Sequence, residues 1–194
     1  LQREPCIEYV LIFHNQGPTA GATLYHPHSQ LIALPIIPPD VSRSLQGSLT
    51  AYATHGRCVH CSVLEWERKA EERIVYENER FLAITPFAPR VSYEVRIYPK
   101  KHQARFEEVD AEDRLLLADA MRTVLGKIKG AMDDPDYNFF IHTAPAKASG
   151  PDYYHWHIEI LPHSSTWAGL ELGTGIEVVA VPPEVSADAL RKAK

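Results

Sequence analysis

The chain has 194 residues, of which 45% are hydrophobic, and this size and composition allow a full domain core and argue against disorder. Its formal net charge of -5 excludes a mainly electrostatic nucleic-acid binder, because neutralising phosphates requires a basic surface. No apolar run reaches the roughly 20 residues of a membrane-spanning helix, and the N-terminus lacks the pattern of a secretion signal. We therefore expect a soluble, cytoplasmic protein that binds neither nucleic acid nor membrane.

The first part of the chain predicts two strands joined by a loop, followed by a helix. Residues 9–13 and 31–37 are short apolar runs bounded by Gly or Pro, which is typical of strands. A pair of prolines ends the second run, and a capped helix is expected over residues 40–54.

The rest of the chain predicts a meander, a long helix, a second hairpin and a last helix. Further strands are expected over residues 73–76, 81–85, 93–98, 138–142 and 153–161. Further helices are expected over residues 63–72, from 110 to about 130, and over 184–193. In the long helix, six apolar residues fall near one face at helical spacing: Leu115, Leu116, Ala118, Met121, Leu125 and Ile128. This order of elements favours an α+β domain with an antiparallel sheet.

A weak internal repeat is the most informative pattern. Residues 25–31 (YHPHSQL) and residues 154–160 (YHWHIEI) each follow an apolar strand and a loop, and each carries a His-x-His. The His pairs are 129 residues apart (155 − 26), while His14 and His142, which end the preceding strands, are 128 apart. The chain therefore contains two copies of one strand, loop, strand hairpin.

The His pairs are candidates for chemistry. Because alternate residues of a strand point to the same face, we expect His26 and His28 to project side by side, and likewise His155 and His157. Two imidazoles on one face can bind a metal, or one of them can attack phosphorus. A lone strand histidine is more often a buried, hydrogen-bonded residue, but two matching pairs favour function.

A glycine-bearing loop, residues 15–23 (NQGPTAGAT), precedes the first His pair. Its glycines allow backbone amides to approach a phosphate, and Asn15 and Thr23 can donate hydrogen bonds. Joined to the His-Pro-His-Ser-Gln that follows, the loop predicts a phosphate cradle leading into a nucleophile.

Two of the three cysteines are spaced as Cys58-x-x-Cys61. In an intracellular protein this spacing indicates metal or redox chemistry more than a disulfide framework. Cys6 is left over, and we expect it to be inert.

Residues 13–30 (FHNQGPTAGATLYHPHSQ) resemble the active-site segment of galactose-1-phosphate uridylyltransferase and its relatives in the histidine triad superfamily. The likeness is specific in this segment and extends more loosely over nearly all of the remaining chain. In that family the second His of His-Pro-His attacks the α-phosphorus, and a Gln two residues later supports the nucleotidylated intermediate. The resemblance implies these catalytic roles for His28 and Gln30. Superfamily hydrolases carry a third His in place of Gln30, so a transferase is implied.

The resemblance also implies substrate contacts around the phosphates. Asn15, Gly21 and Thr23 occupy positions that the family uses there, although Ala22 replaces a residue that is often Cys or Ser. Residues 170–177 resemble the family segment that reaches a neighbouring subunit's active site, with Glu177 as the sugar contact. The alternative for this tail is an ordinary glycine-bearing loop with a strand.

A structural zinc site is implied in the second copy. In the related transferases zinc is held by a Cys-x-x-Cys, a His after the third strand and the first His of the His-x-His. Here these are Cys58, Cys61, His102 and His155. Two thiolates and two imidazoles form a tetrahedral zinc site of ordinary composition. His60 and His142 are competing ligands, and an unoccupied pair of thiols is the alternative.

Two further histidines have weaker assignments. His157 takes the place of His28 in the second copy, but Glu159 replaces the Gln and the loop before it lacks the Asn and Gly arrangement, so we expect it not to be catalytic. By family logic His26 would bind another zinc, but the sequence contains no Cys-x-x-Cys upstream of it.

The predicted fold is α+β, a histidine-triad-like antiparallel sheet with a long helix. Residues 1–55 are expected to form the C-terminal part of a first repeat, carrying the HPHSQ segment. Residues 56–194 are expected to form a second repeat with the zinc site and the tail. Because open sheet edges are usually covered or paired, we expect a homodimer or an intramolecular pairing of the repeats.

The implied function is nucleotidyl transfer through a covalent nucleotidyl-histidine, with a nucleotide sugar and a sugar 1-phosphate as substrates. Uridylyl transfer from UDP-glucose to galactose 1-phosphate is the leading interpretation. A related alternative is a phosphorylase that uses inorganic phosphate on an ADP-sugar or a dinucleoside polyphosphate. An alternative of another class is a zinc-stabilised nucleotide-binding module without turnover.

Overall fold

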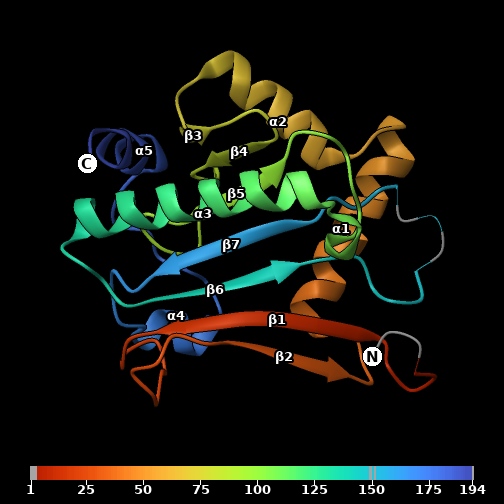
Figure 1. Ribbon diagram of the computed structural model, residues 1–194, viewed down its shortest axis with the longest axis horizontal. Coiled ribbons are helices and arrows are strands. Elements are labelled where there is room, and N and C mark those ends of the chain that lie inside the picture. Colours follow the sequence, from red (N-terminus) through yellow and green to blue (C-terminus); the bar gives the residue numbers. More distant parts are fainter. Residues whose placement is uncertain (1–3, 149, 151, 194) are drawn as a thin grey trace.

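The computed structural model describes residues 4–148, 150 and 152–193, and its centre is a seven-stranded antiparallel sheet. Its strands are β1 (Tyr9–Gln16), β2 (Ser29–Leu34), β3 (Ile74–Glu77), β4 (Phe81–Ile84), β5 (Val95–Pro99), β6 (Tyr137–His142) and β7 (His157–Pro162). They lie in the order β2-β1-β6-β7-β5-β4-β3, which places the two hairpins side by side (Figure 1). The expected α+β fold with an antiparallel sheet and a long helix is confirmed.

Helices pack on both faces of this sheet. They are α1 (Pro39–His55), α2 (Val59–Ala70), the 3₁₀ turn η1 (Phe106–Glu108), α3 (Ala111–Met132), α4 (Gly169–Thr174) and α5 (Pro183–Lys192). Figure 1 shows α3 crossing one face of the sheet with α5 near its end, and the two helices contact each other. Within the described residues, no helix has the length and apolar character needed to span a membrane.

Strand alternation divides the side chains of β7 between two faces. Ile158 and Ile160 are buried in the same cluster as Val124 of α3. His157 and Glu159, which alternate with them, are also buried but point to the opposite face. This second face is the one where α1 and α2 pack, and His60 of α2 lies against His157 there.

The buried face of α3 differs from our prediction. Leu115 is 75% exposed, and Ala118 is exposed as well. Ile128 is buried as predicted, and the predicted Leu116, Met121 and Leu125 are partly buried against the core. The buried residues that the prediction did not include are Leu117, Ala120 and Val124. Three leucines in succession leave the phase of the apolar stripe open, and packing against the sheet selects the third of them, because only that phase aligns it with Ala120 and Val124.

Several element boundaries also differ. β1 extends to Gln16 rather than ending at residue 13, and β7 begins at His157 rather than at residue 153. The second helix begins at Val59, directly after Cys58, rather than at residue 63. β2 ends at Leu34, since the next residue is a proline, which cannot donate to a ladder. The tail forms the short helix α4, closed by Gly175 with φ 71°, which the alternative of a glycine-bearing loop with a strand did not include.

The register between the hairpins corrects the alignment of the two repeats. β1 pairs antiparallel with β6, and Ile12 lies opposite Ile141, 129 residues later. A twofold axis through this pair relates each residue of the first hairpin to the residue 129 positions later, which is also the offset between the His pairs. The counterpart of His142 in the first hairpin is therefore Phe13 and not His14. The faces agree, because His14 stacks on Phe139 at a centroid distance of 5.0 Å, on the α3 side.

Candidate active site and metal centre

The first hairpin carries the predicted phosphate loop between β1 and β2. This loop contains two tight turns. In one the Gly21 amide donates to the Pro18 carbonyl at 3.1 Å, and in the other the Ala22 amide donates to the Gly17 carbonyl at 3.0 Å. Gly17 has φ +84°, and a Cβ there would lie 1.7 Å from the Asp136 carboxylate. Only glycine fits at this position, which explains the residue type in terms of both conformation and space.

His28 lies at the end of this loop, immediately before β2, and not within a strand as we predicted. Its Nδ1 is 2.8 Å from the carbonyl oxygen of His26. Because a carbonyl oxygen can only accept, Nδ1 carries the proton and donates. In the neutral ring Nε2 therefore keeps its lone pair, which is the state that a nucleophilic nitrogen requires.

Two cavities lie at this end of the hairpin, and His28 lines one of them. One of about 290 Å³ is lined by loop residues that include Asn15, Thr23 and His26. Another of about 610 Å³ is lined by His28 and by residues of β1, β6 and α3. Gln30 lies in β2, opposite Phe13 of β1. The structure thus gathers the predicted loop residues and nucleophile at one end of the first hairpin.

The predicted metal ligands come together on the second hairpin side. The ligand atoms of Cys58, Cys61, His102 and His155 all lie within 4.8 Å of one another. The Cys61 sulfur is 3.3 Å from Nδ1 of His102 and 3.5 Å from Nδ1 of His155. In tetrahedral zinc coordination, neighbouring ligand atoms lie roughly 3.5 Å apart, so this group fits such an ion.

Hydrogen bonding and acidity in this cluster also suit a metal. Nε2 of His155 donates to the Pro99 carbonyl at 2.9 Å, which leaves Nδ1 free to ligate. A hydrogen bond from the Cys61 thiol lowers the pKa of Cys58 to about 3. The same bond raises the pKa of Cys61. One thiolate is therefore stabilised before any ion binds, and a divalent ion would favour the second.

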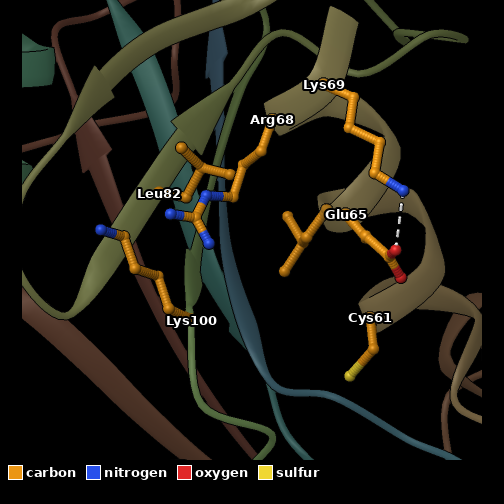
Figure 2. Close-up of a pocket in the computed structure, with 7 residues that line it drawn as sticks. Cys61, Glu65, Arg68, Lys69, Leu82 and Lys100 are labelled. Atoms are coloured by element: carbon orange, nitrogen blue, oxygen red, sulfur yellow. Dashed lines mark hydrogen bonds and ion pairs between the residues drawn. The ribbon is translucent and has the colours of Figure 1, made fainter. Parts of the chain in front are cut away.

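The Cys61 sulfur also borders a cavity of about 400 Å³ between α2 and the end of β5. Figure 2 shows Arg68 and Lys100 on the walls of this cavity, while Lys69 pairs with Glu65 away from them. Arg68 and Lys100 both pair with Glu77, at 3.3 and 2.6 Å. The cavity thus exposes one side of the four-ligand group, at Cys61.

The competing ligands lie elsewhere. The ring of His142 stacks on that of His157 at a centroid distance of 4.7 Å, and its Nε2 lies 3.4 Å from Glu159. His60 is close to His157, at 5.3 Å between centroids, and its Nε2 faces Ser48 at 3.5 Å. Among the described residues, neither histidine belongs to the four-ligand group.

His157 has the same ring tautomer as His28 but is buried. Its Nδ1 lies 3.1 Å from the His155 carbonyl, so its Nε2 is also the unprotonated nitrogen. The residue is only 3% exposed, and burial holds the pKa of its ring well below the ordinary range. It has the nitrogen of a nucleophile but no access to a substrate.

Glu159, the counterpart of Gln30, is surrounded by cations. Its oxygens lie 3.4 Å from Arg96 and 3.6 Å from Arg90. Burial alone would raise its pKa, but His142 and these guanidinium groups hold it below the ordinary value. Burial raises the pKa of neighbouring Glu94 to about 7. Sequence patterns gave no signal for either arginine.

The tail approaches the phosphate loop within the same chain. Glu177 accepts from Nε of Arg90 at 2.6 Å. Both residues line a cavity of about 550 Å³ together with Thr19 of the loop and with Trp167. The predicted sugar contact is thus held by an arginine on the rim of a cavity that borders the loop tip.

Comparisons with known proteins agree with this architecture. Residues 46–178 match the family model described as galactose-1-phosphate uridyl transferase, C-terminal domain. ADP-glucose phosphorylase of Arabidopsis thaliana is 36% identical over 96% of this chain and 52% of its own length. Galactose-1-phosphate uridylyltransferase of Thermotoga maritima is 34% identical over 99% of this chain and 62% of its own.

A solved structure extends the likeness to the coordinates. The crystal structure of an ADP-glucose phosphorylase from Arabidopsis thaliana with bound ADP-glucose is 34% identical, has a TM-score of 0.93, and covers all of this chain and 62% of that one. The chain thus spans between about half and two thirds of the length of these relatives. From its matched residues and its fold, the chain belongs to the galactose-1-phosphate uridyl transferase family.

Proposed function

We propose that the protein is a nucleotidyltransferase that works through a covalent nucleotide on Nε2 of His28. The observation that carries the proposal is the hydrogen bond from Nδ1 of His28 to the His26 carbonyl at 2.8 Å, beside the glycine-bearing loop. It leaves the nitrogen with the free electron pair on a partly exposed side chain. Membership of the family supports the same chemistry.

Two displacements complete the reaction. Nε2 attacks the α-phosphorus of a nucleotide sugar, an N–P bond forms, and the P–O bond to the sugar 1-phosphate breaks with its electron pair on the departing oxygen. A phosphate oxygen of the acceptor then attacks the same phosphorus, and the N–P bond breaks. Asn15, Gly21 and Thr23 would bind the phosphates, and Gln30 would support the intermediate, by positioning and charge stabilisation.

The leading substrates are UDP-glucose and a hexose 1-phosphate, with galactose 1-phosphate as acceptor. This assignment follows the name of the family and of the Thermotoga maritima relative. The second candidate is phosphorolysis of an ADP-sugar, in which inorganic phosphate is the acceptor. It is favoured by the relative named ADP-glucose phosphorylase and by the related structure with bound ADP-glucose.

We further propose that zinc occupies the group formed by Cys58, Cys61, His102 and His155, and that it has a structural role. The four ligands supply a closed coordination sphere, which is typical of structural rather than catalytic zinc. We also propose that the chain works as a cytoplasmic homodimer, with Glu177 contacting the sugar at an active site.

Labelling separates these assignments. The protein is incubated with UDP-glucose or ADP-glucose labelled at the α-phosphorus, and the modified residue is located by peptide mapping. We expect label on His28, none in His28→Asn, and retained label in His157→Asn, the matched variant of the second hairpin. Release by galactose 1-phosphate favours the uridylyltransferase, and release by inorganic phosphate favours the phosphorylase. Nucleotide binding without any covalent label would indicate a non-catalytic module.

A further inference from the structure

The phosphate loop is held by residues of the second repeat, and these residues also fix which end of the Asn15 amide faces the ligand. β1 pairs with β6 so that Asn15 lies directly opposite Asn138. Cross-strand neighbours of this kind are within side-chain reach. Nδ2 of Asn138 donates to Oδ1 of Asn15 at 2.8 Å.

The direction of this hydrogen bond follows from its surroundings. Asn138 also contacts the Ala20 carbonyl at 2.9 Å, and a carbonyl can only accept, so the Asn138 atom at this place is its nitrogen. Its Oδ1 then faces Nε2 of His163 at 2.8 Å, which must be the donor. His163 therefore donates to Asn138, and Asn138 donates to Asn15.

A second contact ties down the tip of the same loop. The backbone amide of Thr19 donates to the Asp136 carboxylate at 2.7 Å, and the Thr19 hydroxyl donates to the same oxygen. Gly17 lies so close to this carboxylate that a side chain there would overlap it. The loop tip and Asn15 are therefore both held by β6 and the residue before it.

We propose that Asn138 is a positioning residue for nucleotide binding, one that turns the NH₂ group of Asn15 toward the phosphate. With Oδ1 of Asn15 occupied by Asn138, the donor Nδ2 points across the loop and lies 3.8 Å from the place of a Cβ on Gly21. An acceptor there would repel a phosphate oxygen, whereas a donor binds it. The ligand class is the phosphate of a nucleotide. This inference rests on the proposed function, because Asn15 acts there on the substrate.

A mutant cycle on His28 labelling tests the proposal. Asn138→Asp keeps the shape of the side chain but removes both donors, so we expect the labelling rate to fall by about tenfold or more, as on removing a positioned donor. Asn15→Ala should cause a similar loss. Because Asn138 acts through Asn15, Asn138→Asp should cost less than about twofold further in the Asn15→Ala background. Losses that multiply in the double variant would overturn the proposal.

The matched control is Asn78→Asp. Asn78 also donates its amide to a backbone carbonyl, that of Leu116 at 2.8 Å, but it lies next to α3 and away from the loop. This variant controls for lost stability, and its labelling rate should match that of the unmutated chain. A loss equal to that of Asn138→Asp would mean that destabilisation, and not positioning, explains the effect.

A readout that needs no turnover separates failure of the inference from failure of the proposed function. In the free protein the side-chain amide of Asn15 should give a resolved nuclear magnetic resonance signal that Asn138→Asp shifts and Asn78→Asp leaves in place. If the unmutated chain is never labelled, the proposed function fails, and this signal still decides the orientation of Asn15. An Asn15 signal unchanged by Asn138→Asp would overturn the inference.

Discussion

The two hairpins share one local geometry and differ in their surroundings. In each, the second histidine of His-x-His donates from Nδ1 to the carbonyl two residues earlier, at 2.8 Å for His28 and 3.1 Å for His157. His28 is partly exposed at the end of an open loop. His157 is 3% exposed and is enclosed by aromatic rings. The motif therefore sets which nitrogen is free, and packing sets whether a substrate can reach it.

What encloses the second hairpin is material that the first hairpin lacks in this chain. α2 brings His60 against His157, and β5 brings Tyr98, whose ring stacks on it at a centroid distance of 4.9 Å. The four-ligand group adjoins the same rings, because the ring of His60 also lies 6.4 Å from that of His155 between centroids. The second hairpin is thus enclosed where the first is open.

The largest effect should come from the metal centre of the second hairpin. Cys58→Ser removes a buried ligand, so we expect loss of bound zinc and a fall of at least about 3 kcal/mol in the free energy of unfolding, since a structural metal contributes folding energy directly. The melting temperature should fall by about 6–12 °C. Metal analysis and calorimetry measure both.

Cys6→Ser is the matched control for this prediction, because Cys6 is an exposed thiol. It should change neither metal content nor stability. Equal metal content in Cys58→Ser and the unmutated chain would contradict the assignment of the site.

A smaller effect on stability should follow from exchanging Glu159 and Gln30, which occupy the same position in the two hairpins. Glu159→Gln removes one of the two carboxylates that Arg96 and Arg90 each approach, and Glu94 and Glu177 remain as their other partners. We therefore expect a loss of about 1–2 kcal/mol in the free energy of unfolding, as on weakening a buried ion-pair network. The reciprocal Gln30→Glu, on the open hairpin, should change stability by less than about 0.5 kcal/mol. Denaturant unfolding of both variants compares them. Equal losses would mean that the two hairpins are equally dependent on this position.

The smallest effect should be a pH dependence of the first hairpin. Hydrogen bonds from Thr19 hold the pKa of Asp136 below its ordinary value of 3.8. Because the folded pKa is the lower one, the stabilisation is fully present above the unfolded value and is lost as pH falls through the folded pKa. The Thr19 amide signal should therefore titrate with a midpoint below 3.8, and Asp136→Asn should abolish this titration. A midpoint at or above 3.8 would contradict the hydrogen bonds from Thr19 to Asp136.

Much of the fold could be predicted because its signals are local. Alternation and punctuation located the strands, and an amphipathic pattern located α3 from residue 110. In the structure the side chain of Asp110 caps this helix by accepting from the Asp113 amide. The predicted face of α3 was right for Ile128 but wrong for Leu115, because Leu115, Leu116 and Leu117 are equally apolar and only packing against the sheet distinguishes them. The tail helix α4 was missed because glycines in a six-residue segment give no helical periodicity.

The residues of the candidate site could likewise be predicted only in part. Spacing and family resemblance selected Cys58, Cys61, His102 and His155, and the structure brings these four together. The residues that hold the phosphate loop could not be found from the sequence, because Asn138 and Asp136 lie more than 115 residues away from their partners. The repeat alignment erred by one residue at His14, since a strand's register is decided by its neighbour and not by its own composition.

The pairing of β1 with β6 has a consequence for how the chain folds during synthesis. Its contacts join residues about 120 to 130 positions apart, so β1 emerges from the ribosome long before its partner strand. Contacts of such long range form late, after local helices and hairpins. The phosphate loop can form its hydrogen bonds to Asp136 and Asn138 only after α3 and β6 have been synthesised. The nucleotide chemistry proposed for His28 would therefore become available only once most of the second repeat has been synthesised and has docked.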